Sequence, residues 1–163
     1  MNNRQALYLL WATILNQSQK AMQVLLNTRE LMNRLNLIEN FETSYNLLTY
    51  EKIESAMLVK PVLHRFPKSM SIYLYSSVVN VLENYIDVKD IFKGNNETIE
   101  RRLCSFPGIG KHKAETAIVI MNTCFGNNNK SNYSLFNAKC TALQETIGVE
   151  FEILNELGEY DDK

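Results

Sequence analysis

One run of apolar residues constrains the fold more than any other feature of this sequence. Ile72, Tyr75, Val79, Leu82 and Ile86 advance along the chain by 3, 4, 3 and 4 positions. This spacing places their side chains on one face of an α-helix, whereas a half-buried strand needs strict alternation. The stretch also holds β-branched valines, but its length and regular advance favour a helix over a strand. The sequence therefore predicts a helix here, with this face in the core.

The same helical spacing recurs along the rest of the chain, for example at Leu7, Leu10 and Ile14 and again between residues 53 and 57. Only 6 Gly and 3 Pro are present, too few turn residues for a many-stranded sandwich. Residues that break helices interrupt the pattern at 60–61, 66–67, 93–96, 106–110 and 126–132. We therefore predict a compact all-α bundle of about eight helical segments.

Charge is unevenly divided along the chain. Residues 150–163 carry a net charge of −5, whereas residues 1–149 hold 16 basic and 12 acidic groups. We therefore predict one all-α domain over 1–149 and an acidic C-terminal tail over 150–163, a candidate contact for a protein partner. The excess of basic residues in the domain is compatible with a phosphate-binding face. Surface charge that keeps the protein soluble explains the same asymmetry.

The cysteines limit which metals and cofactors are expected, and the apolar stretches limit which cell compartment is expected. Cys104, Cys124 and Cys140 lack Cys-x-x-Cys spacing, and with two histidines in the chain we expect free thiols, no metal and no cofactor. No stretch reaches the roughly 20 apolar residues of a membrane span, and no signal peptide is evident. We expect a soluble cytoplasmic protein, nucleoid-associated in a bacterium or nuclear in a eukaryote.

Residues 97–124 have the pattern of two helices joined by a short hairpin. The joining string is Phe106-Pro107-Gly108-Ile109-Gly110-Lys111-His112-Lys113-Ala114. Its two glycines let the backbone turn tightly and approach a ligand, and the first N–H groups of the second helix lack intrahelical partners. With the helix dipole, Lys111 and Lys113, these groups suit one DNA phosphate. The alternative is a plain helix–helix turn with Ile109 filling the core.

This string, continuing to Cys124-Phe125-Gly126, resembles the helix–hairpin–helix of the endonuclease III-like DNA glycosylases. A second stretch, Ile14-Leu15-Asn16-Gln17-Ser18-Gln19, is similar to the Leu-Gln-Gln-Thr-Gln of their adenine-glycosylase branch, which lies against the DNA at the flipped-out base. The resemblance implies a six-helix barrel that binds double-stranded DNA. Gln17 and Gln19 then fill the hole left by an extruded base or read its partner. The alternative for both is a polar helix end.

Two positions depart from the family's pattern. Asn137 stands where the family has an Asp that stabilises the developing oxocarbenium, and it supplies no negative charge. His112 stands where the bifunctional lyases have a Schiff-base lysine, and the family's four-cysteine iron–sulfur cluster is not expected. The resemblance therefore implies a monofunctional N-glycosylase or, as the alternative, a non-catalytic helix–hairpin–helix module that binds DNA or protein. His112 is a candidate acid or phosphate ligand, or an exposed first-turn histidine; Asn137 orients a water or caps a helix.

The other conspicuous side chains are predicted to be structural. Arg101 and Arg102 fit a solvated helix face, with contact to a neighbouring DNA phosphate as the less favoured alternative. No partner is evident in the sequence for His64. Four aromatic residues lie in apolar helical patterns and are predicted core residues rather than stacking platforms for bases: Trp11, Tyr73, Tyr75 and Tyr85.

Overall fold

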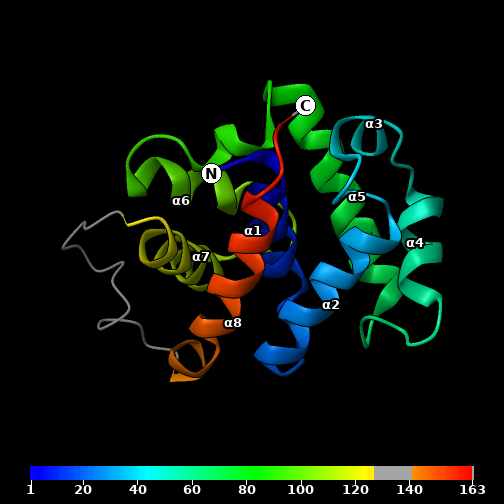
Figure 1. The fold of residues 1–163 in the computed structure, drawn as a ribbon, viewed down its shortest axis with the longest axis horizontal. Coiled ribbons are helices and arrows are strands. Elements are labelled where there is room, and N and C mark those ends of the chain that lie inside the picture. The colour runs from blue at the N-terminus through cyan, green and yellow to red at the C-terminus, as the bar shows by residue number, and fades with distance from the viewer. Residues whose placement is uncertain (127–140, 163) are drawn as a thin grey trace.

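The computed structural model describes residues 1–126 and 141–162 of the 163-residue chain. These residues form eight α-helices and one short 3-10 helix, η1, and include no strand (Figure 1), which confirms the predicted all-α class. The elements are α1 (Asn3–Leu15), α2 (Ala21–Arg34), α3 (Phe41–Asn46), α4 (Tyr50–Leu58), α5 (Pro67–Asn84), η1 (Val88–Phe92), α6 (Asn96–Cys104), α7 (Lys111–Cys124) and α8 (Thr141–Gly158). None of the helices in these two ranges has the length and apolarity needed to cross a membrane.

Helix α1 is the centre of the bundle. All of its residues are buried, and it packs against α2, α5, α7, α8 and η1. A helix that is apolar around most of its circumference is stable only when other elements surround it. The Trp11 indole of α1 is fully buried, and its Nε1 donates to Ser77 Oγ of α5 at 3.1 Å. The N-terminal end is closed by a capping box between Asn2 and Gln5.

Helix α5 confirms the predicted helix but buries a different face from the predicted one. Ile72 and Leu82 are 55% and 53% exposed, and Ile86 lies beyond the end of the helix and is 95% exposed. The buried face is formed by Met70, Ser71, Leu74, Ser77, Val78 and Val81. The prediction missed this face because it contains two serines, whose hydroxyls are satisfied by carbonyls one turn earlier in the helix.

Residues 150–158 are the second half of α8, so the predicted boundary at residue 149 falls inside a helix. The helix lies along α1 and α2, which it contacts (Figure 1). Ile153, Leu154 and Leu157 are buried in this contact, at positions that share one helical face. The charge count that predicted a separate tail overlooked this apolar face, because Glu152 and Glu156 are interspersed with these residues in the sequence.

The C-terminal segment is tied to the start of α1 by polar contacts. Asn2 Nδ2 donates to the carbonyls of Leu157 at 2.8 Å and Tyr160 at 2.9 Å. The backbone N–H of Asn3 donates to Asp162 Oδ1 at 2.8 Å, and Lys89 Nζ pairs with Asp162 Oδ2 at 2.6 Å. Burial alone would raise the pKa of the Asp162 carboxyl, but Lys89 and this N–H outweigh it and hold the pKa below its ordinary value.

We expect Asp162→Asn to lower the free energy of unfolding by about 1 kcal/mol at neutral pH. Because the pKa of Asp162 is lowered in the fold, this contribution is present above the unfolded pKa of about 4 and is lost as the pH falls through the folded pKa. Urea unfolding at pH 7 and at pH 2 measures both values. Asp161→Asn removes a neighbouring exposed carboxylate and is the matched control. An equal loss at both pH values would contradict the ion pair's role.

Candidate nucleic-acid interface

The hairpin between α6 and α7 is a tight turn packed on α5. The backbone N–H of Ile109 donates to the Phe106 carbonyl at 3.3 Å, and both of these side chains are buried. Gly108 has a φ of +81°, and a Cβ at this position would lie 3.1 Å from the ring of Tyr73. Glycine is therefore needed here for both backbone conformation and space. Ile109, one of the predicted DNA contacts, is buried, and its backbone N–H is already bonded within the turn.

The first turn of α7 presents unpaired backbone donors. Gly110 is the N-cap and supplies no capping side chain, so the first bond along the helix runs from the Ala114 N–H to the Gly110 carbonyl at 3.0 Å. The N–H groups of Lys111, His112 and Lys113 have no hydrogen-bond partner among the described residues. These donors and the positive end of the helix dipole are what an anionic oxygen requires.

The cationic side chains of this turn have different surroundings. Lys111 is exposed, and so is His112, whose ring makes no hydrogen bond with the described part of the chain. Lys113 instead folds inward, and its Nζ donates to the carbonyls of Gly108 at 3.0 Å and Ile14 at 3.3 Å. Burial lowers the pKa of Lys113. Lys113, predicted as a DNA contact, thus ties the hairpin to the end of α1.

The α1–α2 turn, with the predicted residues Gln17 and Gln19, lies beside the hairpin. The Gln17 N–H donates to the Leu15 carbonyl at 2.8 Å, and Ser18 adopts a φ of +57°. The Gln17 side chain is exposed, whereas Gln19 is half-buried and its Oε1 has no partner among the described residues. The Lys113–Ile14 bond joins the hairpin to the end of α1, directly before this turn. The structure thus brings together two motifs that lie about 90 residues apart in the sequence.

His64 has two hydrogen-bond partners, neither of which was evident in the sequence. Its Nε2 lies 2.9 Å from the Leu15 carbonyl and donates to it, and its Nδ1 accepts from the Phe66 N–H at 2.9 Å. This arrangement needs the neutral ring. Burial lowers the pKa of His64 and the charge of Lys113 lowers it further, against the opposing effect of the Leu15 bond.

The His64 contacts place a further cation and an aromatic ring at the end of α1. Phe66 is 42% exposed, and the Arg65 guanidinium lies 5.6 Å from its ring centroid. An exposed ring next to an arginine suits stacking on a nucleobase. Neither residue was predicted as part of the site, although the adjacent Arg65-Phe66 pair is visible in the sequence.

The remaining predicted residues are structural or lie outside the described residues. Arg102 donates to the carbonyls of Asp90 and Ile91 at 3.2 and 3.3 Å and so closes the C-terminal end of η1, whereas Arg101 is exposed. Trp11 is buried, and Tyr73, Tyr75 and Tyr85 pack partly buried against the core, as predicted. Asn137 and Cys140 lie in the 127–140 segment, outside the described residues.

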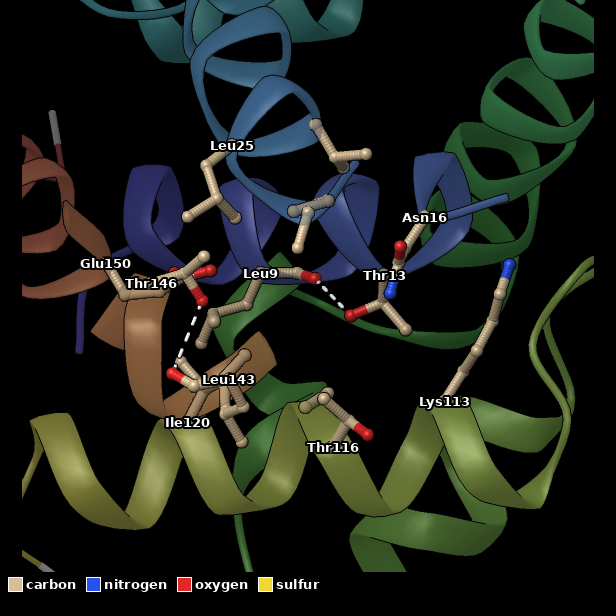
Figure 2. A pocket seen from close by; sticks show the side chains of 14 residues that line it. Leu9, Thr13, Asn16, Leu25, Lys113, Thr116, Ile120, Leu143, Thr146 and Glu150 are labelled. Atoms are coloured by element: carbon tan, nitrogen blue, oxygen red, sulfur yellow. Dashed lines mark hydrogen bonds between the residues drawn. The ribbon is translucent and has the colours of Figure 1, made fainter. Parts of the chain in front are cut away.

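A cavity of about 60 Å³ lies between α1, α2, α7 and α8 (Figure 2). Its walls are mostly apolar, with polar side chains from Thr13, Asn16, Lys113, Thr116, Thr146 and Glu150. Glu150 is 2% exposed, and its Oε2 has no hydrogen-bond partner in the described ranges. Burial raises the pKa of Glu150 to about 7, an effect that the nearby Tyr8 hydroxyl opposes.

Glu150 is the principal site residue that the sequence analysis missed, because it was assigned to the acidic tail. The signal was present, since Leu143, Thr146, Glu150, Leu154 and Leu157 advance by 3 or 4 positions and share the buried face of α8. A carboxyl on such a face, in a cavity and with a shifted pKa, is typical of a functional site.

Comparison with known proteins adds no relative to this picture. No protein-family model, no curated protein and no solved structure matches the chain. A functional assignment therefore depends on the residues and geometry described above.

Proposed function

We propose that this protein binds double-stranded DNA through the surface formed by hairpin residues 106–113 and the α1–α2 turn. The observation that carries the proposal is the uncapped first turn of α7, whose free N–H groups stand beside the exposed Lys111 and the Gln17 turn. One DNA phosphate would accept from these N–H groups, which positions the duplex without reading its sequence.

The proposal extends to the fold and activity of the endonuclease III-like DNA glycosylases, which the chain resembles. On this view the helices around α1 form the family's barrel, and Gln17 faces the site of an extruded base. His112, exposed on the first turn of α7, is the acid or the phosphate ligand of a monofunctional N-glycosylase. The alternative is a non-catalytic DNA-binding module, favoured by Asn137 at the family's Asp position.

Fluorescence anisotropy tests the DNA-binding proposal. The ligands are a short duplex with a stable abasic-site analogue and the same duplex undamaged, each measured in about 50 and 200 mM salt. Tighter binding to the abasic duplex that weakens with salt would support a glycosylase-like surface. Salt-dependent binding that is equal for both duplexes would support the non-catalytic module. No binding to either duplex would contradict the proposal.

We expect Gly110→Ala to weaken DNA binding about tenfold while lowering the free energy of unfolding by no more than about 1 kcal/mol, because glycine is the better N-cap residue. A Cβ at Gly110 meets no atom within 4 Å, and the φ of −92° suits alanine, so the fold tolerates the methyl group. The methyl group would, however, stand where the phosphate approaches. Lys111→Ala should reduce the slope of log affinity against log salt by about 1.

The matched control is Lys52→Ala, which removes an exposed lysine from α4, a helix that packs mainly against α5. Its DNA affinity should equal that of the wild-type protein. Equal losses for Lys52→Ala and Lys111→Ala would mean that only overall charge matters, and would contradict the hairpin as the contact.

A further inference from the structure

We propose that the cavity between α1, α2, α7 and α8 receives the polar edge of a nucleobase, and that Glu150 is the residue that hydrogen-bonds this edge. The inference rests on the proposed function, because it takes the ligand to be a base presented by bound DNA. It adds a recognition residue from α8, an element that contributes nothing to the hairpin or to the α1–α2 turn.

The exposures of the lining residues show where the cavity opens. Asn16 is exposed and Lys113 and Thr116 are half-exposed, whereas Leu143 and Glu150 are buried. The mouth therefore lies at the α1–α2 turn and the first turns of α7, which are the two parts of the proposed DNA surface. Figure 2 shows Glu150 and Lys113 toward opposite ends of the cavity. A base leaving the duplex at this surface would meet Glu150 at the inner end.

The walls and the size of the cavity suit the edge of one aromatic ring. Leu9, Val24 and Leu25 line it from α1 and α2, and Ala117 and Ile120 line it from α7. Apolar side chains on two sides are the surfaces that the faces of a base contact. The volume of about 60 Å³ equals that of about two waters, well below a usual small-molecule site. It admits a ring edge and not a whole nucleotide.

At the inner end, one oxygen of the Glu150 carboxyl, Oε2, makes no hydrogen bond of good geometry with the described residues, although the Tyr8 hydroxyl lies close enough to favour the ionised form. A buried oxygen without a hydrogen bond destabilises the fold, and Glu150 Oε2 is such an atom in the described structure. The titratable groups near it are Tyr8 from α1 and Cys124 from α7, whose pKa values are raised mainly by burial and further by the carboxylate. Helix α2 contributes apolar residues to the cavity. A neutral carboxyl donates through one oxygen and accepts through the other. A base edge with an acceptor beside a donor satisfies both.

Free adenine is the probe, because it presents such an edge and does not depend on DNA binding. Two-dimensional NMR at about pH 6, where the carboxyl is largely protonated, follows adenine titrated into the full chain. We expect shifts for residues of this cavity, an affinity about tenfold weaker in Glu150→Leu, and retained binding in Glu150→Gln, whose amide also donates and accepts. Glu152→Gln, on the exposed side of α8, is the matched control and should bind as the wild type does.

Benzene at the same concentration separates polar recognition from simple filling of an apolar space. Glu150→Leu should bind benzene at least as well as the wild type. Adenine affinity unchanged in Glu150→Leu, or wild-type shifts confined to other parts of the chain, would overturn the inference.

The abasic duplex keeps this result apart from the proposed function, since it carries no base at the site. Its affinity should be unchanged in Glu150→Leu. Loss of adenine binding with intact abasic-duplex binding would support the role of Glu150. Adenine binding by a protein that binds no duplex would contradict the proposed function and leave the nucleobase site supported.

Discussion

Replacing Glu150 by glutamine is expected to stabilise the protein by about 3 kcal/mol at pH 8 and to leave its stability nearly unchanged at pH 4. In the unfolded chain this carboxyl ionises with a pKa near 4.5, whereas burial raises the folded value to about 7. The fold therefore favours the protonated form. Stability from this group is full below the unfolded pKa and is lost as the pH rises through the folded pKa. Glutamine has the shape of the protonated acid and does not ionise.

Urea unfolding of both proteins between pH 4 and pH 8 measures this difference. Glu152→Gln, which removes an exposed charge from the same helix, should change stability by a few tenths of a kcal/mol at every pH. A pH-independent difference between wild type and Glu150→Gln would show that the carboxyl is not held in a low-polarity site. A stabilising change at a buried residue is also characteristic of positions kept for function at the expense of stability.

The second large effect is expected at the hairpin, where Gly108→Ala should lower the free energy of unfolding by about 2 kcal/mol. Gly108 has a φ of +81°, a region that disfavours side chains, and the added Cβ would lie 3.1 Å from the Tyr73 ring. The turn would shift to relieve both, and with it the start of α7. DNA binding should therefore fall together with stability.

Two comparisons test the origin of this loss. Gly110→Ala is the matched control, because its backbone suits alanine and its Cβ meets no atom within 4 Å. A double variant, Tyr73→Leu with Gly108→Ala, separates the contact with the ring from the cost of the backbone conformation at residue 108. Only the contact depends on residue 73. Equal thermal unfolding of the two glycine variants would contradict a specific requirement for glycine at position 108.

Local patterns predicted most of the helices, because spacing of 3 and 4 residues is set by the geometry of the helix itself. They did not predict which side of α5 faces inward. That helix has two partly apolar faces, and the packing of α1 decides between them, with Ser77 accepting from Trp11. Ile72 and Leu82 satisfied the pattern and remain exposed.

The polar features were predicted less well, since their partners are distant in sequence. His64 bonds to the end of a helix 49 residues earlier, and no local pattern carries that information. Glu150 was counted as surface charge, because a carboxylate is usually solvated and its burial is a property of the assembled helices. The turn between α6 and α7 falls at the predicted break, because its glycines and the helix start that follows are specified locally.

The carbonyls at the end of α1 bear on how the proposed DNA surface would bind. Ile14 accepts from Lys113 of the hairpin, and Leu15 accepts from His64, which in turn holds the 64–66 segment. Two surface segments from distant parts of the sequence are therefore fastened to one buried helix. Such a surface is preorganised, so a ligand that spans it does not have to order loose segments first. Most of the conformational entropy lost on binding should therefore be lost by the ligand rather than by the protein.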